Sequence, residues 1–175
     1  MLVHLSDIVS QTGKTENMEV PVTVDVIKSE LGSFKIAEKS PLHLQIINTG
    51  NKVLELTCDV KLVIPMPCDR CLKEVPVDFD LHFQSKLDMK QSREDRIKDL
   101  DESDYITGLD LDTDLLICNE VLINWPLKVL CKEDCKGICS RCGQNLNEGT
   151  CQCDRTSLDP RMAAISDIFS KFKEV

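Results

Sequence analysis

The residues with the most distinctive chemistry in this 175-residue chain are its ten cysteines. Eight of them form four short-spaced pairs, which are Cys68/Cys71, Cys131/Cys135, Cys139/Cys142 and Cys151/Cys153. The chain begins without the basic and apolar segments of a signal peptide, and it has no apolar run of transmembrane length. We therefore expect a cytoplasmic protein with reduced thiols, in which paired cysteines bind metal more often than they form disulfides.

The last two pairs predict a zinc site. Zn²⁺ takes four ligands in a tetrahedron, and proteins commonly supply them as two short-spaced pairs from two loops. Cys139 and Cys142 are followed by Gly143, which suits a turn whose backbone amides point at the sulfurs and stabilise the thiolates. Together with Cys151 and Cys153 they form the first predicted metal site. A closed site of four thiolates leaves no coordination position open, so its role is structural.

The two remaining pairs predict a second zinc site. Cys68 and Cys71 lie in the loop of a predicted hairpin, and Cys131 and Cys135 follow some sixty residues later. The four thiols meet if the later loop folds over the tip of the hairpin. A different pairing, in which ligands are mixed among the six C-terminal cysteines, stays open.

Other chemistry finds little support in the sequence. Cys58 and Cys118 occupy apolar positions of regular elements, so we expect them to be core thiols. Cys68 and Cys71 could act as a redox dithiol, but such enzymes place the pair at a helix N-terminus, and here it lies between prolines in a hairpin loop. The chain contains no glycine-rich phosphate-binding motif, and its three histidines lie away from the cysteine pairs. We predict a binding protein and not an enzyme.

The charge distribution limits the partners. A net charge of −9, from 21 basic and 30 acidic side chains, excludes a broadly basic nucleic-acid-binding surface. Residues 91–125 hold ten acidic and only three basic side chains. We expect residues 91–104 to form a solvated loop. The alternative is an acidic strip that contacts a basic partner through Asp99, Asp101, Glu102 and Asp104.

Several basic side chains flank the cysteines. RNA-binding zinc modules use such residues to hold phosphates, although acidic neighbours here make ordinary surface charge an equally simple interpretation. If both metal sites form, these cations could converge on one face. The candidates for contact with RNA or with a protein partner are Arg70, Lys73, Lys136, Arg141 and Arg161.

The elements that must position the cysteines are mainly strands. Apolar and polar residues alternate over residues 54–64 and again over 75–89, which predicts two half-buried strands. A ten-residue loop joins them, so they are expected to form an antiparallel hairpin with Cys68 and Cys71 at its tip. Shorter alternating runs over 20–26 and 42–46 predict further strands.

Two helices are predicted after the strands. Residues 112–125 form the first, which ends at Trp125-Pro126, and residues 159–175 form an amphipathic second one that begins at Asp159-Pro160. The expected apolar face of the first helix consists of Leu115, Cys118, Val121 and Leu122. We predict an α+β fold, with a mainly antiparallel β-sheet, a few helices and a Cys-rich zinc-binding C-terminal module. The expected domains are an α+β domain (1–128), a zinc module (129–158) and the C-terminal helix (159–175).

An ordered set of motifs resembles one known family. The first part of the set is Cys68-Asp-Arg-Cys-Leu72 after an alternating strand, the acidic central stretch, and a helix running into Trp125-Pro126-Leu127. The second part is Cys135-Lys-Gly-Ile-Cys-Ser-Arg-Cys-Gly-Gln-Asn-Leu-Asn147, then Cys151-Gln-Cys153 and Asp159-Pro-Arg161. Over nearly the whole chain, this set resembles the bacterial YceD family of large ribosomal RNA subunit accumulation proteins, in its Gram-positive branch.

The resemblance implies a non-catalytic role in ribosome biogenesis, in the synthesis, processing or stability of large-subunit (23S) rRNA. The expected partner is large-subunit rRNA or, because the chain carries a net charge of −9, a basic large-subunit ribosomal protein. No contact with a membrane is expected. The expected cofactor is Zn²⁺, with one or two ions per chain. Two alternatives are kept: a chaperone-like binder of a basic ribosomal protein without RNA contact, and a thiol oxidoreductase.

Overall fold

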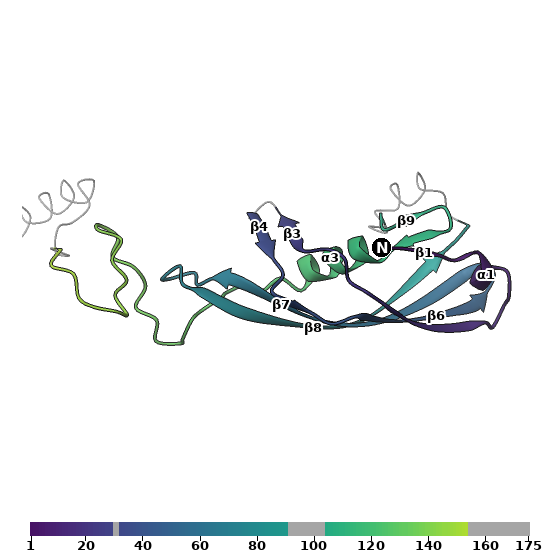
Figure 1. Cartoon of the computed structure of the whole chain (residues 1–175), viewed down its shortest axis with the longest axis horizontal. Coiled ribbons are helices and arrows are strands. Elements are labelled where there is room, and N and C mark those ends of the chain that lie inside the picture. Colours follow the sequence, from purple (N-terminus) through teal and green to yellow (C-terminus); the bar gives the residue numbers. More distant parts are fainter. Residues whose placement is uncertain (30–31, 91–103, 154–175) are drawn as a thin grey trace, which may run out of the picture.

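The computed structural model describes residues 1–29, 32–90 and 104–153. The predicted helix over 159–175, Arg161, and the acidic stretch 91–104 apart from Asp104 lie outside these residues. The described chain forms a long layer of antiparallel strands with helix α3 and two small sheets on one side (Figure 1). The predicted class, a mainly antiparallel sheet with a few helices and cysteine groups toward the C-terminus, is confirmed.

The large sheet is built around one long hairpin. Strands β7 (Val53–Pro67) and β8 (Glu74–Asp88) pair over all fifteen residues of each. On the other side of β7, β6 (Leu42–Gly50) pairs with its first half and the short β5 (Glu38–Lys39) with its second. Strand β2 (Thr15–Val20) pairs with β6 and completes the sheet. All of these pairings are antiparallel, as the alternating pattern predicts.

One face of this sheet forms the core. Every second side chain of β7 from Leu54 to Met66 is at most 2% exposed, and the residues between them lie on the other face. The same alternation holds in β8, where Phe79, Leu81 and Leu87 are buried. The period-two pattern of residues 54–64 and 75–89 is therefore a correct prediction of the buried face.

The hairpin reaches further toward its tip than predicted, because the strands continue through prolines. Pro65 pairs with Pro76. Neither proline has a backbone N–H. They lie opposite one another at a position where the two strands exchange no hydrogen bond, so no N–H is missing there. The connecting loop shrinks from the expected ten residues to residues 68–73, which places Cys68 and Cys71 directly at the strand ends.

Smaller elements cover the core face. The sequence order is β1 (Leu2–His4), α1 (Ser6–Val9), β3 (Val26–Ser29), β4 (Gly32–Lys35), β9 (Ile106–Thr107), β10 (Asp110–Asp112) and α3 (Thr113–Ile123). Strands β1, β10 and β9 form one small sheet, and β3 pairs with β4 in another. The strand predicted over residues 20–26 is split, since β2 ends at Val20 and β3 begins at Val26.

Helix α3 lies within the predicted range 112–125, but its buried face differs from the expected one. Leu116, Ile117 and Val121 are buried, whereas Leu122 is 40% exposed. Apolar side chains occur on all sides of this helix, so their spacing does not single out the face that packs on the sheet. After the helix, the Trp125 ring packs edge-on against Phe34, with ring centroids 4.8 Å apart.

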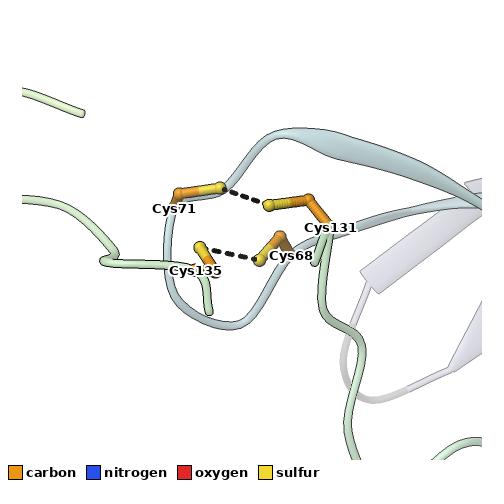
Figure 2. Close-up of side chains that lie close together, drawn as sticks. All are labelled: Cys68, Cys71, Cys131 and Cys135. Carbon is orange, nitrogen blue, oxygen red and sulfur yellow. Dashed lines mark hydrogen bonds between the residues drawn. The ribbon is translucent and has the colours of Figure 1, made fainter. Parts of the chain in front are cut away.

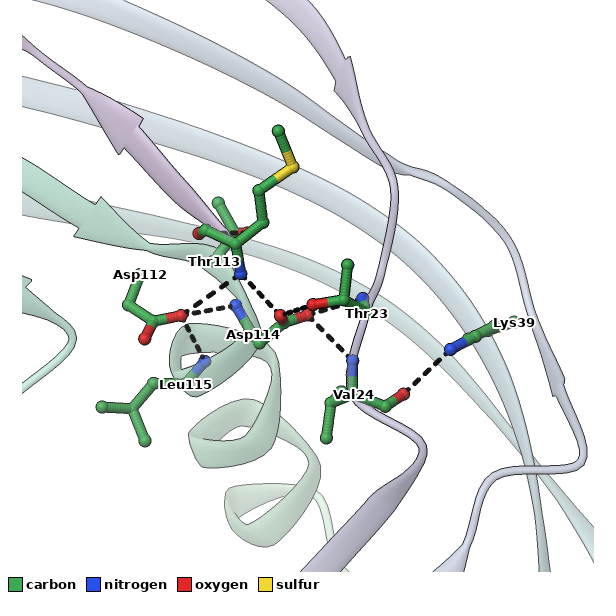
Figure 3. A network of polar contacts seen from close by, with 8 residues as sticks. Thr23, Val24, Lys39, Asp112, Thr113, Asp114 and Leu115 are labelled. Atoms are coloured by element: carbon green, nitrogen blue, oxygen red, sulfur yellow. Dashed lines mark hydrogen bonds and ion pairs between the residues drawn. The ribbon is translucent and has the colours of Figure 1, made fainter.

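Figure 3 shows how the start of α3 is fixed. The Asp112 carboxylate caps the helix by accepting the backbone N–H groups of Asp114 (3.1 Å) and Leu115 (3.3 Å). The Asp114 carboxylate accepts the backbone N–H groups of Thr23 (2.9 Å) and Val24 (3.2 Å), and also the Thr23 hydroxyl. These contacts hold the segment between β2 and β3 on the helix, which explains why residues 20–26 do not form one strand.

We expect Asp114→Asn to lower the free energy of unfolding by about 2 kcal/mol at neutral pH, because charged hydrogen bonds are replaced by weaker ones. Burial raises the pKa of Asp114, but its hydrogen bonds and the Met1 ammonium outweigh burial and hold the pKa below the ordinary 3.8. A depressed carboxyl pKa gives stability that is complete above the unfolded-state value and is lost as the pH falls through the folded-state value.

Urea unfolding at neutral pH and near pH 3 measures this effect. The difference between the wild type and Asp114→Asn should shrink at the lower pH. Asp7→Asn, an exposed carboxylate on α1, is the matched control and should change little at either pH. An equal difference at both pH values would contradict the assignment to the Asp114 carboxylate.

Candidate metal centres at the end of the hairpin

The structure gathers the eight paired cysteines into two groups of four. The hairpin-tip cluster consists of Cys68, Cys71, Cys131 and Cys135, and the C-terminal cluster consists of Cys139, Cys142, Cys151 and Cys153. Within each cluster all four Sγ atoms lie within 4.8 Å of one another. None of the ten cysteines forms a disulfide. The grouping is the one expected from the spacing, and the ligands are not mixed among the six C-terminal cysteines.

The hairpin-tip cluster joins the loop between β7 and β8 to a segment some sixty residues further along the chain (Figure 2). The Sγ atoms of Cys71 and Cys131 are 3.5 Å apart, and those of Cys68 and Cys135 are 3.9 Å apart. A zinc ion with four sulfur ligands at about 2.3 Å has sulfur–sulfur edges of about 3.8 Å. The four thiols therefore fit a tetrahedral metal site, and their spacing is far too wide for disulfides.

Backbone contacts clamp the later segment onto the hairpin loop. The Asp69 N–H donates to the Val129 carbonyl (2.9 Å), and the Val129 N–H donates to the Asp69 carboxylate (2.7 Å). The Ile138 N–H donates to the Arg70 carbonyl (3.0 Å). The chain passes so close at Gly137 that an added Cβ would lie 2.9 Å from the Arg70 oxygen. The cluster is thus part of a built junction and not a chance meeting of loops.

Arg70 has a structural role in this junction. Its guanidinium donates to the backbone carbonyl of Cys135 (2.8 Å), which fixes the loop that carries two of the thiols. Arg70 was predicted as a contact to RNA or a partner; its bond to a backbone carbonyl sixty-five residues away leaves no signal in the sequence around it. Asp69, a member of the Cys68–Leu72 motif, and Val129, which belongs to no motif, complete the clamp.

The two C-x-R-C turns have the same construction. The Cys68 N–H donates to the Lys73 carbonyl (2.8 Å), and the Leu72 N–H donates back to the Cys68 carbonyl (2.9 Å). The second turn repeats these bonds with Cys139, Gln144 and Gly143, each at 2.9 Å. The fifth residue of each turn is left-handed, with φ of 61° at Leu72 and 74° at Gly143. The glycine suits this conformation, whereas the leucine is strained in it.

We expect Leu72→Gly to stabilise the protein by about 1 kcal/mol, because glycine removes the steric cost of the left-handed backbone. The Leu72 side chain is 62% exposed, so little packing is lost. Leu127→Gly is the matched control, since Leu127 is fully exposed and its φ is not positive. Thermal unfolding of both variants measures the effect. A fall in melting temperature for Leu72→Gly equal to that of the control would contradict this account.

The same turns stabilise the thiolate of their first cysteine. Burial raises the pKa of Cys68, but backbone N–H groups that point at its sulfur, led by that of Arg70, lower the pKa to about 6. The backbone N–H groups of Cys142 and Arg141 likewise lower the pKa of Cys139 to about 6. Thiolates are the form that binds metal, and a divalent cation among four sulfurs favours the thiolate at every position. The arrangement can therefore hold a soft or borderline cation.

The C-terminal cluster is more exposed than the hairpin-tip cluster, and it is attached to that cluster. Cys139 is 5% exposed, whereas Cys142 is on the surface. Between the two pairs, Asn147 donates its amide Nδ2 to the Cys135 sulfur (3.3 Å) and accepts the Lys136 N–H (2.8 Å). Asn147 therefore links the two clusters. The sequence analysis treats it only as part of the family motif, because an asparagine carries no ligand signal of its own.

The remaining predicted residues belong to neither cluster. Lys73, Lys136 and Arg141 are exposed, and the described part of the chain gives none of the three side chains an ion-pair partner. Cys58 is fully buried on the core face, and burial raises its pKa to about 12. Cys118 is half-buried on α3, away from both clusters.

Comparisons with known proteins give one match. A family model described as "Large ribosomal RNA subunit accumulation protein YceD" matches residues 56–169, which is more than half of the chain. The matched range begins within β7 and includes all eight paired cysteines. No curated protein and no solved structure matches the chain. No helix in the described part of the chain has the length and apolar character needed to cross a membrane.

Proposed function

Since the chain belongs to the YceD family of large ribosomal RNA subunit accumulation proteins, we propose that it is a non-catalytic factor supporting the synthesis, processing or stability of 23S rRNA. The observation that carries this proposal is the family match, which spans both cysteine clusters and the long hairpin. The family description concerns the accumulation of an RNA and names no reaction. The proposed place of action is the bacterial cytoplasm.

The eight clustered cysteines are proposed to hold two Zn²⁺ ions with a structural role. Zinc would supply folding energy to a segment with little apolar core of its own, because residues 126–153 contain no helix or strand longer than an isolated bridge. The chain's own residues pre-form the sites: amides stabilise the thiolates, and Arg70 and Asp69 hold the loops together. The division into a sheet domain (1–128), a zinc module (129–158) and a C-terminal helix (159–175) belongs to this proposal.

RNA contact is proposed for the cations at the metal end of the molecule. Lys73, Lys136 and Arg141 are exposed there, and Arg161 follows in the sequence. Each cation that neutralises a phosphate adds to affinity and to its salt dependence. Arg70 is left out of this set, because its guanidinium already serves the Cys135 carbonyl.

The test is the ratio of large- to small-subunit rRNA in cells depleted of this protein. The ratio should fall, and the wild-type chain should restore it. Lys73→Gln/Arg141→Gln should restore it only in part if these cations contact RNA, whereas Lys14→Gln/Lys52→Gln, at the far end of the sheet, should restore it fully. An unchanged ratio after verified depletion would reject the proposed function.

A second candidate is a chaperone-like binder of a basic ribosomal protein without RNA contact. The net charge of −9 favours it, since direct RNA binding depends on cationic contacts. This candidate predicts a complex that survives nuclease treatment and dissociates as salt is raised. The thiol oxidoreductase alternative lacks a comparable observation, because the thiols of Cys68 and Cys71 each contact a thiol of the other loop, at 3.9 Å and 3.5 Å.

A further inference from the structure

The large sheet has one face that no described element covers. In Figure 1, α3, β1, β3, β4 and β9 all lie on one side of β6, β7 and β8. The opposite side, called the outer face here, consists of the alternate residues of each strand that point away from the core. It spans strands β2, β6, β7 and β8.

The outer face is strongly acidic. Strand β8 contributes Glu74, Asp78, Asp80 and Asp88 to it. Strands β2, β5 and β7 contribute Glu19, Glu38, Glu55 and Asp59. Besides these eight carboxylates, the strand residues of the outer face include only two lysines, Lys61 and Lys86.

The two lysines do not offset this charge. Lys61 pairs with Asp80 and Lys86 with Glu55, each at 2.9 Å, so both cations are already used within the face. Apart from Asp88, whose carboxylate accepts the Lys90 N–H, five negative charges remain when the histidines that pair with Glu19, Asp59 and Asp80 are neutral. The self-repulsion of such a surface is relieved when cations bind to it.

The outer face is also hollowed. A groove of about 440 Å³ crosses β2, β6 and β7, and Glu19 and Asp59 contribute carboxylates to its lining. These two residues lie in one cross-strand row, in which Glu19 opposes His43 and His43 opposes Asp59. The neighbouring row is neutral and polar, with Gln45 donating to the Asn17 side chain (2.8 Å). Carboxylates beside amides can hold guanidinium and ammonium groups and hydrogen-bond a peptide backbone.

We propose that this groove and the acidic face around it dock a segment of a partner protein rich in lysine and arginine. Charge complementarity selects this occupant: nucleic-acid phosphates are repelled, and a second copy of this acidic chain would bring like charges together. The proposal rests on the proposed function and deepens it, by naming the class of partner and placing it on the face of the sheet away from the core-covering elements. The cations at the metal end remain available for RNA.

The test uses the full zinc-loaded chain and a synthetic extended peptide in which Lys and Arg alternate with Thr, with a second peptide carrying Gln at the basic positions. Glu19→Gln/Asp59→Asn should weaken binding of the basic peptide by about tenfold at low salt. The matched control is Asp7→Asn/Asp134→Asn, which removes the same charge from exposed sites elsewhere and should bind like the wild type. The glutamine peptide should not bind measurably.

Three results would overturn the proposal. One is equal binding by the wild type and Glu19→Gln/Asp59→Asn. Another is equal weakening by the control, which would show an effect of net charge only. The third is tight binding of a single-stranded RNA that competes with the peptide at this groove. The rRNA ratio in depleted cells is read separately: a ratio that falls while the peptide result is negative rejects the docking face alone, and an unchanged ratio rejects the cellular function.

Discussion

Replacing both Cys68 and Cys71 by serine is expected to remove one of two bound zinc ions and to release residues 126–153 from the end of the hairpin. These cysteines provide half of the ligands that join the hairpin loop to the later segment. Structural zinc sites contribute about 10–16 kcal/mol to the folding of small modules. This is far more than the few backbone bonds that join Asp69 to Val129 and Arg70 to Ile138. The loss of this metal should therefore undo the junction.

Metal analysis of anaerobically purified protein and amide hydrogen exchange measure the two effects. The wild type should carry two zinc ions per chain, whereas the variant should carry one and lose protection in residues 126–138, with residues 139–153 still held by their own four thiols. Cys118→Ser is the matched control, because Cys118 is a half-buried thiol outside both clusters, and it should keep both ions. Retention of two ions by Cys68→Ser/Cys71→Ser would contradict the ligand assignment. A metal-free wild type with reactive thiols would contradict the zinc proposal.

Replacing both Cys139 and Cys142 by serine is expected to remove the other zinc ion with a more local structural effect. All four thiols of the C-terminal cluster come from residues 139–153, and in the described part of the chain Asn147 connects this segment to Cys135 of the hairpin-tip junction. The junction keeps its own four thiols in this variant. We therefore expect residues 139–153 to lose their order, while the sheet keeps the wild-type free energy of unfolding.

Hydrogen exchange again separates the outcomes. Amides of β7 and β8 should stay as protected as in the wild type, and those of residues 139–153 should exchange freely. The comparison with Cys68→Ser/Cys71→Ser is decisive. Both variants lose two thiols, but only Cys68→Ser/Cys71→Ser is expected to release residues 126–153 from the hairpin. Loss of both zinc ions from Cys139→Ser/Cys142→Ser would show that the clusters are one cooperative unit, against this prediction.

Much of the fold could be predicted from the sequence, because the pattern of β7 and β8 is nearly free of exceptions. A strand with one buried face leaves its period in the sequence, and here it continues from Leu54 to Met66. The cysteine grouping was also accessible, because short-spaced pairs have few ways to build two sites of four. The strands and the cysteine groups could both be predicted because each depends on a pattern of residues close together in the sequence.

The features that escaped prediction depend on partners distant in the sequence. Nothing near Arg70 indicates that its guanidinium meets the Cys135 carbonyl, and nothing near Asn147 indicates a bond to a sulfur of the other cluster. The strands continue through Pro65 and Pro76 only because the register sets these residues opposite one another. The acidic outer face is visible only when the strands are aligned, since its carboxylates come from four separate segments.

The sixty positions between Cys71 and Cys131 also set an order of folding. Closing a loop of that length costs about 1.7 kcal/mol more in chain entropy than closing the nine positions between Cys142 and Cys151. The C-terminal cluster can close by itself from a short stretch of unfolded chain. The hairpin-tip cluster needs the paired strands first, since they bring Cys68 and Cys71 to the place where the later segment arrives. Metal binding by the hairpin-tip cluster therefore requires that the strands of the sheet have already paired.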